Sequence, residues 1–376
     1  MNHHELIEDI KRRGNFRTIP ADRTDSDILD FSTNDYLGLA GRDDLRHAFM
    51  SGDSALNALL TSSASRLLAA TQSAYHELEQ TLESLYGRTA LMFNSGYHAN
   101  SGLIPALCDK DTLILADKLV HASIIDGIML SKCSWQRFRH NDITHLGRIL
   151  DKERPDGHNT LIIIESIYSM DGDSAPIEEL IEFKRRYPGV MLYIDEAHAL
   201  GVVGDRGLGL AASSSDPDAF DIIVGTLGKA AASMGAFAVM SPTLRDVAVN
   251  RCRSLIFSTA LPPLNAAWST VMLKQIVEMD AERAHLADLA QHLADGLAEI
   301  TGKIYTPSHI QPVIVGDARL AVELSAKLSD EGIKVLPIRT PTVPPGTERL
   351  RISLSASMTH DDIDRLLSAL NQQIGR

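Results

Sequence analysis

Short, uninterrupted apolar runs recur through the middle of the chain and restrict it to one class of fold. Five of them have the length of a strand: "LILA" 113–116, "LIII" 161–164, "MLYI" 191–194, "IIV" 222–224 and "FAVM" 237–240. Runs without polar alternation are typical of strands that are covered on both faces. Segments with helical periodicity, such as 75–87 and 177–189, lie between several of them. This order predicts an α/β domain with a mostly parallel central sheet.

The pattern changes in the last third of the chain. A long amphipathic helix is predicted over 277–300, where Leu286, Leu289, Leu293 and Leu297 fall on one stripe. Two more helices and two strands are predicted at 322–332, 361–375, 310–316 and 349–355. We therefore expect three parts, namely an N-terminal segment over 1–45, a large α/β domain over 46–270 and a small C-terminal α+β domain over 271–376.

Composition and charge narrow the function classes. The 376 residues carry a net charge of −13, which argues against a nucleic-acid binder because that function needs a basic face. Cys108, Cys133 and Cys252 show no CxxC spacing, so a reducing compartment fits best and we expect a cytoplasmic protein. No apolar run approaches the ~20 residues of a membrane span, and residues 1–16 lack the apolar region of a secretory signal.

Polar residues follow the predicted strands at the point where each strand ends. Four strands deliver them in turn: Asp117 and His121, then Glu165 and Ser169, then Asp195 and His198, and last Thr226 and Lys229. Ligands of open parallel sheets bind outside the carboxyl ends of the strands. We therefore expect these side chains to share one edge of the sheet and to form a site there.

Lys229 has an unusual setting for a lysine. It follows a tight "GTLG" turn and precedes three alanines, so desolvation would lower its pKa and make its amine nucleophilic. An acid at the end of a buried strand can hold a ring nitrogen protonated, and a histidine can stack on a flat heteroaromatic ring. Thr226 and the backbone amides of 94–100, at a predicted helix start, can hold a phosphate. Together these groups describe a site for pyridoxal 5'-phosphate (PLP).

The same residues also permit other interpretations. Taken alone, Asp195 could cap a helix, His121 could be a core residue and Ser169 could belong to a turn. The string "DEAH" at 195–198 also occurs in helicases, but the chain has no GxxxxGK[ST] phosphate loop. Asp195 and His198 as metal ligands would need further partners, and none stands out, so we expect no metal.

Eight sequence blocks then carry a resemblance to a known family. In order they are 31–39, 93–100, 116–127, 140–146, 167–177, 193–204, 225–230 and 257–263, including "FNSGYHAN", "IYSMDGDSAPI", "YIDEAHALGVVG" and "GTLGKA". The chain is similar, nearly end to end, to the α-oxoamine synthases, which are fold-type I PLP-dependent transferases. The resemblance implies PLP as cofactor and a homodimer with its PLP sites at the interface.

The resemblance also implies roles for single residues around the cofactor. Lys229, His121, Asp195 and His198 would be catalytic. Lys229 would bind PLP as a Schiff base, Asp195 would pair with the pyridine nitrogen and His121 would stack on the ring. His198 and Ser169 would approach the phenolic oxygen. The phosphate would be held by Thr226, by the backbone amides of Gly96 and Tyr97, and, in the neighbouring subunit, by Ser258 and Thr259.

The substrates follow from the same resemblance. Arg351 would grip the carboxylate of an amino acid, Arg17 and Thr342 would contact the acyl substrate, and Asn34 would lie near the substrate. Blocks 310–317 and 338–356 are most similar to the family members of biotin biosynthesis. They imply that L-alanine condenses with pimeloyl-CoA or pimeloyl-carrier protein to give 8-amino-7-oxononanoate, CO₂ and free thiol.

Two rival functions remain open at this point. One is a sister activity, either glycine C-acetyltransferase or a synthase for another acyl thioester. The other is a non-catalytic interaction protein with the same fold, although Lys229, Asp195 and His121 would then be unnecessary.

One block departs from the family pattern. Residues 61–79 read "TSSASRLLAATQSAYHELE", with Ala and Ser where glycines are common in the family. Tyr75, not His76, occupies the position where a histidine is frequent. We expect this block to leave PLP binding intact and to affect the loop conformation and the fit of the acyl chain.

Overall fold

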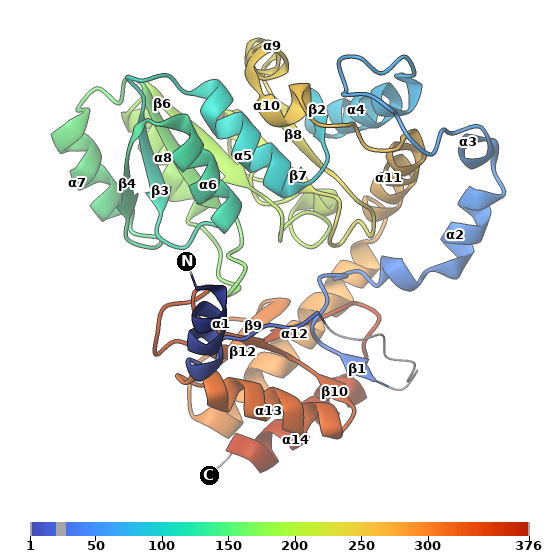
Figure 1. Cartoon of the computed structure of the whole chain (residues 1–376), viewed down its shortest axis with the longest axis vertical. Coiled ribbons are helices and arrows are strands. Elements are labelled where there is room, and N and C mark those ends of the chain that lie inside the picture. Colours follow the sequence, from blue (N-terminus) through green and yellow to red (C-terminus); the bar gives the residue numbers. More distant parts are fainter. Residues whose placement is uncertain (1, 20–27, 375–376) are drawn as a thin grey trace. The chain divides into compact units, whose positions relative to one another are not determined.

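The computed structural model describes residues 2–19 and 28–374 (Figure 1). It divides into two compact units. The larger unit comprises Leu37–Tyr168 and Ser174–Arg283, and the smaller unit comprises the residues up to Tyr36, the short insert Ser169–Asp173 and the chain from Ala284 onwards. These divisions differ from the expected boundaries at 45 and 270. Arg283 belongs to the larger unit because its guanidinium donates to the carbonyls of Gly201 and Ile276.

The larger unit is built on a seven-stranded sheet with the order β2-β8-β7-β6-β5-β3-β4. The strands are β2 (Thr89–Phe93), β3 (Leu113–Asp117), β4 (Ser134–Phe138), β5 (Thr160–Glu165), β6 (Val190–Asp195), β7 (Ile222–Thr226) and β8 (Ala236–Met240). Only the pairs that involve β8 are antiparallel. The prediction of a mostly parallel α/β sheet is therefore confirmed, and each of the five apolar runs lies in a strand.

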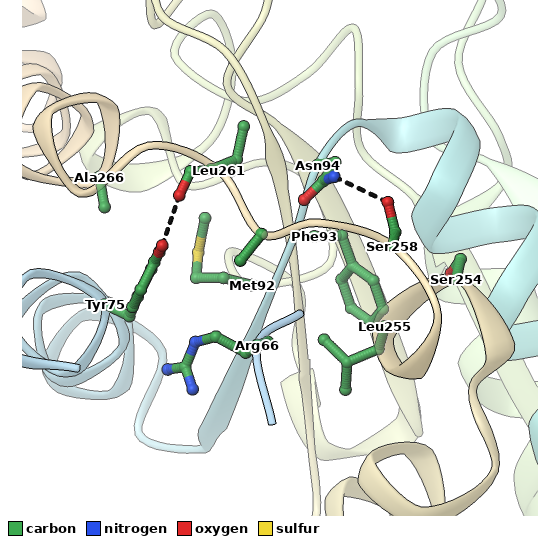
Figure 2. Close-up of a pocket in the computed structure, with 11 residues that line it drawn as sticks. Arg66, Tyr75, Met92, Phe93, Asn94, Ser254, Leu255, Ser258, Leu261 and Ala266 are labelled. Atoms are coloured by element: carbon green, nitrogen blue, oxygen red, sulfur yellow. Dashed lines mark hydrogen bonds between the residues drawn. The ribbon is translucent and has the colours of Figure 1, made fainter. Parts of the chain in front are cut away.

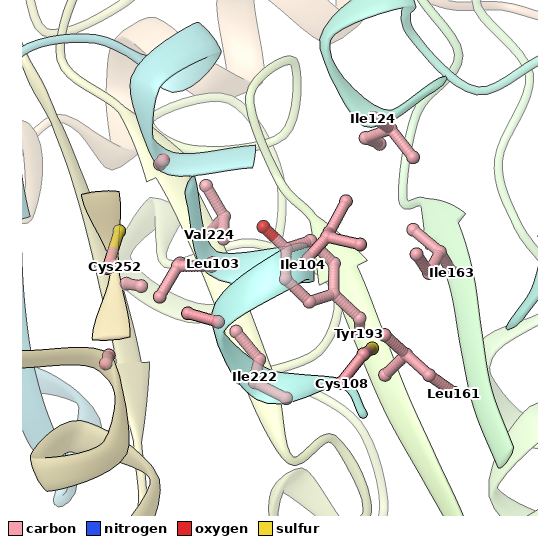
Figure 3. Packing of buried hydrophobic residues seen from close by; sticks show 14 of the residues in the cluster. Leu103, Ile104, Cys108, Ile124, Leu161, Ile163, Tyr193, Ile222, Val224 and Cys252 are labelled. Carbon is pink, nitrogen blue, oxygen red and sulfur yellow. The ribbon is translucent and has the colours of Figure 1, made fainter. Parts of the chain in front are cut away.

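Helices pack on the sheet through close contacts that small residues permit. Figure 3 shows Leu103 and Ile104 of α5 (Gly96–Leu107) and Ile124 of α6 (Ala122–Ser131) among the apolar side chains of the strands. α6 approaches α5 so closely that a Cβ at Gly127 would lie 2.5 Å from the carbonyl oxygen of Asn100. Glycine is therefore required at this contact, and the close packing that it permits holds α5 against α6.

The remaining helices of the larger unit surround this core. They are α2 (Asp43–Met50), α3 (Asp53–Leu56), α4 (Ser73–Tyr86), α7 (Ile143–Glu153), α8 (Ile177–Arg186), α9 (Pro242–Arg251), α10 (Arg253–Ile256) and α11 (Pro263–Ile276), with short 3₁₀ helices at Leu39–Gly41, Asp205–Gly207 and Pro217–Ala219. α4 ends as predicted, because Gly87 takes a left-handed conformation at its C-cap (φ 67°).

The smaller unit combines helices with short sheets, as predicted for the C-terminal part. Its elements are α1 (His3–Arg12), β1 (Leu29–Asp30), β9 (Ile310–Ile314), α13 (Ala318–Asp330), β10 (Ile333–Lys334), β11 (Leu336–Ile338), β12 (Arg349–Ser353) and α14 (His360–Ile374). β11, β12 and β9 form an antiparallel sheet, and β1 pairs with β10 in parallel. The long helix α12 (Asp280–Thr301) continues into this unit, and its predicted leucine stripe is buried.

Two further features bear on the class of protein. Within residues 2–19 and 28–374, no helix has both the length and the apolar character that crossing a bilayer requires. Cys108, Cys133 and Cys252 are all buried free thiols.

Candidate active site

The carboxyl ends of the central strands bring most of the predicted site residues of the larger unit together. β5 and β6 end on Glu165 and Asp195, which are paired in register. β7 ends on Thr226, and the loop from β7 to β8 carries Lys229. The turn between β3 and α6 carries His121, which is the N-cap of α6. The parallel order of the sheet thus places acid, base and lysine at one edge.

Lys229 lies against His198. The amine Nζ is 2.8 Å from the imidazole Nε2 of His198. The lysine is partly buried, and the methyl groups of Ala230 and Ala231 beside it are fully buried. The loop that carries Lys229 is held by Trp268, whose indole N–H donates to the carbonyl of Ala232 over 3.1 Å. The alanines that follow Lys229 are therefore buried, and the printed contact of its amine is the imidazole of His198.

Asp195 is a buried carboxylate with two amide donors. Its Oδ1 accepts the backbone N–H of Ala197 at 2.9 Å, and its Oδ2 accepts the side-chain amide of Asn100 at 2.7 Å. Only 5 % of Asp195 is exposed. Donors of this kind stabilise the ionised form of a carboxyl group. Asn100 was not among the predicted site residues, although it is the last residue of the recognised block 93–100.

His121 is oriented by groups on both sides. Its backbone N–H donates to the Glu165 carboxylate, and its ring Nδ1 lies 2.8 Å from the hydroxyl of Ser123. Burial lowers the pKa of His121, although the charge of Asp195 acts in the opposite direction. A neutral imidazole near pH 7 is suited to stacking on a flat ring.

Two buried glutamates support this edge. Glu165 was expected at the edge but had no predicted role, and Glu196 was not among the predicted site residues. Burial, reinforced by the charge of Asp195, raises the pKa of Glu165 to about 8. Burial likewise raises the pKa of Glu196 to about 7. The Glu196 carboxylate accepts the backbone N–H of Ala211, and a Cβ at Gly209 (φ +95°) would lie 2.7 Å from it. Glu196 therefore fixes the loop that follows the "DEAH" string.

The predicted phosphate-binding residues gather at the start of α5. A Cβ at Gly96 would lie 3.9 Å from the hydroxyl of Thr226, so the N-terminus of α5 faces the end of β7. Asn94 links this point to the predicted segment after α10, because its amide donates to the Ser258 hydroxyl at 3.1 Å (Figure 2) and to the Thr259 carbonyl at 2.6 Å. Tyr97 is half-exposed on α5, where its hydroxyl contacts Asp126. Helix N-termini bind phosphate readily.

The block that departs from the family pattern packs against the same segment. Ser65 pairs with Thr259 in a β-bridge, and the buried hydroxyl of Tyr75 donates to the carbonyl of Leu261 (Figure 2). Arg66 lies over the ring of Tyr75, 4.7 Å from its centroid, and forms an ion pair of 2.8 Å with buried Glu79. Arg66, Tyr75 and Leu261 line a cavity of about 20 Å³, which has room for one water molecule. Tyr75 thus anchors the loop where the family often has histidine.

In the smaller unit, Arg351 is the centre of a second cluster. Its buried guanidinium donates to the Ser169 carbonyl and the Ser353 hydroxyl, each at 2.6 Å. Nη2 makes two longer contacts, 3.2 Å to Asn34 Oδ1 and 3.4 Å to the Tyr36 hydroxyl. The structure therefore unites Arg351, Asn34 and Ser169, all predicted, with Tyr36 and Ser353, which were not. Burial raises the pKa of Tyr36 to about 12, so its hydroxyl stays neutral.

The two predicted acyl contacts lie in the same unit but not in that cluster. Arg17 reaches the carbonyl of Thr340 at 3.5 Å, and the exposed Thr342 follows in the same loop. Arg339 donates to the carbonyls of Gly14 and Phe16 and so holds the segment of Arg17 in place. For the part of the chain that the structure describes, no group of three or more His, Cys, Asp or Glu side chains is arranged to hold a metal ion.

Comparison with known proteins places the chain among relatives that match it over nearly its full length. Residues 26–370 match the model of the aminotransferase class I and II family. The 8-amino-7-oxononanoate synthase of Haemophilus ducreyi is 46 % identical over 91 % of both chains. A protein of Pasteurella multocida, whose name gives the same activity provisionally, is 47 % identical over 98 % of both chains.

Solved structures agree with this result. A serine palmitoyltransferase with PLP superposes with a TM-score of 0.86 at 30 % identity and covers 92 % of this chain and 87 % of its own. The 8-amino-7-oxononanoate synthase of Francisella tularensis superposes with a TM-score of 0.77 at 28 % identity, over 93 % of this chain and 98 % of its own. The chain therefore belongs to the aminotransferase class I and II family, and its resemblance to the α-oxoamine synthases, drawn from its motifs, is confirmed.

Proposed function

We propose that this protein is a PLP-dependent acyltransferase that condenses L-alanine with a pimeloyl thioester, carried by CoA or by a carrier protein. The products are 8-amino-7-oxononanoate, CO₂ and the free thiol, in biotin biosynthesis. One observation carries the chemistry, namely the contact of 2.8 Å between Lys229 and His198 at the strand edge that also holds buried Asp195. The names of the curated relatives support the choice of substrates.

The residues of the larger unit fit PLP. The Lys229 amine would attach the aldehyde of the cofactor, and Asp195, held by two amide donors, would face the pyridine nitrogen. The neutral His121 would stack on the ring. The phosphate would lie where Gly96 and Thr226 meet at the N-terminus of α5. When bound, PLP supplies an electron sink for the carbanion that forms at the Cα of the amino acid.

The side chains of this protein would then bind, orient and move protons. Lys229 would take the proton from the Cα of alanine, since a released lysine amine is a suitable base. His198 lies close enough to orient that amine and to exchange a proton with it. Arg351 would bind the alanine carboxylate in bidentate fashion. We expect the carboxylate to replace the two long contacts that Nη2 makes with Asn34 and Tyr36.

The acyl end and the cellular location belong to the same proposal. Arg17 and Thr342 would contact the acyl substrate. Ser169 would approach the phenolic oxygen of PLP together with His198. The three buried thiols suit a reducing, cytoplasmic location.

We also propose that the protein is a homodimer, with Ser258 and Thr259 reaching the PLP phosphate of the neighbouring subunit. Large apolar side chains are exposed in the larger unit between α2 and α4 and beside Ser258: Met50, Leu56, Leu59, Leu60, Leu67, Leu68 and Phe257. Monomeric proteins seldom expose so many large apolar side chains in short stretches of chain, and such surfaces mark protein contacts.

A second candidate is a sister activity with another acyl thioester or with glycine. The observation that favours it is the solved serine palmitoyltransferase, which superposes at least as well as the solved 8-amino-7-oxononanoate synthase, with TM-scores of 0.86 and 0.77. The shared fold therefore does not by itself select the acyl chain.

A product assay separates the two candidates. The purified protein is incubated with PLP, one amino acid (alanine, glycine or serine) and one thioester (pimeloyl, acetyl or palmitoyl), and the products are identified by mass spectrometry. We expect 8-amino-7-oxononanoate from alanine and pimeloyl thioester only. The Lys229→Ala variant is the control and should lose product formation by many orders of magnitude. A preferred product from glycine or from another acyl chain would contradict the proposal.

A further inference from the structure

Asn100 lies at the centre of a buried hydrogen-bond network that joins two predicted cofactor residues. Its amide Nδ2 donates to Asp195 Oδ2 at 2.7 Å and to the Ser123 hydroxyl at 3.0 Å. Its Oδ1 accepts the hydroxyl of Tyr193 at 2.6 Å. The Ser123 hydroxyl in turn lies 2.8 Å from the ring Nδ1 of His121. One side chain therefore connects the acid of the site with its histidine.

The hydrogen-bond pattern permits one orientation of the amide. Nδ1 of His121 accepts the backbone N–H of Ser123, so this nitrogen carries no proton and the Ser123 hydroxyl must donate to it. The oxygen of Ser123 is then left to accept from Asn100. A flipped amide would place Oδ1 against the Asp195 carboxylate and the Ser123 oxygen, neither of which has a proton to donate to it. Only the observed orientation supplies both of these oxygens with a donor.

Packing holds the amide in that place. Asn100 is 1 % exposed, and Tyr193 is fully buried on β6. The backbone of Asn100 cannot shift toward α6, because Gly127 already approaches its carbonyl closely. A buried and fully satisfied polar network of this kind is rigid, and the loss of one member leaves its partners unpaired.

We propose that Asn100 is a positioning residue for PLP. It aims the Asp195 carboxylate by donating to it, and through the Ser123 hydroxyl it orients the ring of His121. The inference rests on the cofactor part of the proposed function and does not depend on the amino acid or the acyl chain.

Other titratable groups also face Asp195 and must be considered in the test. They are Glu165 on β5, Tyr193 on β6, Glu196 directly after β6 and His121 before α6, and Lys229 in turn acts on Glu165 and His121. All of them remain in an Asn100 variant, so a change relative to the unmodified protein reports on the amide alone.

The experiment measures PLP binding by the whole protein rather than turnover. PLP is removed and titrated back, followed by its visible absorbance, and the bound form is then acidified until PLP is released. For Asn100→Ala we expect an affinity for PLP about tenfold weaker or more, since a hydrogen bond to a charged carboxylate is lost. We also expect PLP release at a higher pH than in the unmodified protein, because the carboxylate that would face the pyridine nitrogen has lost a hydrogen-bond donor to its charged form.

Three further variants make the result decisive. Tyr193→Phe keeps the Asn100 amide but removes the hydroxyl that donates to it. We expect it to shift the PLP affinity and the pH of release in the same direction as Asn100→Ala, by a smaller factor. If Asn100→Ala does not fold, this variant tests the role of Asn100. Thr270→Val is the matched control, since it removes a buried hydroxyl that donates to the Ala266 carbonyl within α11, and should shift neither. Asp195→Asn should abolish tight binding, and if it does not, the cofactor assignment fails rather than the role of Asn100.

An Asn100→Ala protein with unchanged PLP affinity would overturn the inference. A weaker affinity with no shift in the pH of release would also overturn it, because the amide would then act only through packing.

Discussion

Burial and the neighbouring charge of Asp195 both favour the protonated form of the Glu165 carboxyl group. Both raise the pKa of this carboxyl group, from 4.5 to about 8, while Lys229 and the backbone N–H of His121 oppose them. The folded protein therefore binds a proton at Glu165 that the unfolded chain has already lost above pH 4.5. The free energy of unfolding must then fall as the pH rises through this window, and level off above the folded pKa.

We predict that Glu165→Gln removes this slope. The neutral amide keeps an acceptor for His121, so the variant should gain stability relative to the unmodified protein as the pH rises from about 4.5 to about 8, by at most ~1.4 kcal/mol per pH unit. Urea unfolding at a series of pH values measures the difference. Glu179→Gln, on the exposed face of α8, makes the same replacement of a carboxyl group by an amide and should show no such trend. A pH-independent difference for Glu165→Gln would show that its carboxyl is ionised in the folded state.

Sequence reasoning found some site residues and missed others for a physical reason. Asp195 and Lys229 follow apolar runs, and the parallel-sheet rule alone brings such residues to one edge. Asn100 has no such signal. It lies inside α5, and its partner Asp195 is 95 positions away, so only the packing of α5 on the sheet brings the two together. Tyr36 beside Arg351 was missed for the same reason.

Among the elements, the loop from β7 to β8 shows how local conformation serves the site. Ala232 has a positive φ of 43°, a conformation that costs a residue with a Cβ ~1–2 kcal/mol. The loop keeps it because Ala232 N donates to the Lys229 carbonyl at 2.8 Å and Trp268 binds the Ala232 carbonyl. These contacts hold Lys229 in its place at the edge of the sheet.

We predict that Ala232→Gly relieves this strain. Glycine adopts positive φ freely but loses more chain entropy on folding, so the net gain should be at most ~1 kcal/mol. Ala231→Gly is the matched control, because Ala231 is fully buried and lacks a positive φ; it should destabilise by ~1 kcal/mol. The denaturant midpoints of the two variants should therefore lie on opposite sides of the unmodified protein. A lower midpoint for Ala232→Gly together with a higher midpoint for Ala231→Gly would contradict the assignment of strain to Ala232.

The predicted elements also differ in how readily the sequence revealed them. The five apolar runs became β3, β5, β6, β7 and β8, because central strands are buried on both faces and read as continuous apolar segments. The edge strand β4, "SWQRF", has mostly exposed side chains, so its composition gave no such signal. The short insert Ser169–Asp173 in the smaller unit was also missed, because a segment of turn residues carries no periodic pattern.

At the scale of the whole molecule, the exposed apolar surface of the larger unit is the feature that needs an explanation. Leu60 is 76 % exposed and directly precedes the block 61–79 that departs from the family pattern. Leu68 is 78 % exposed and lies within that block. That block pairs with the segment of Ser258 and Thr259 through the bridge at Ser65. If a second copy covers these leucines, association and the phosphate contacts of PLP depend on the same stretch of chain.

We therefore predict that the double substitution Leu60→Asp and Leu68→Asp separates the proposed dimer and weakens PLP binding together. Both side chains are exposed in the single chain, so its fold should survive the change, while two charges in an apolar contact would oppose association. Light scattering after size exclusion gives the mass, and titration gives the PLP affinity. Leu320→Asp on α13, 43 % exposed in the smaller unit, should alter neither. A double variant that stays dimeric would place the contact elsewhere, and a monomeric variant with full PLP affinity would show that Ser258 and Thr259 do not serve the neighbouring subunit.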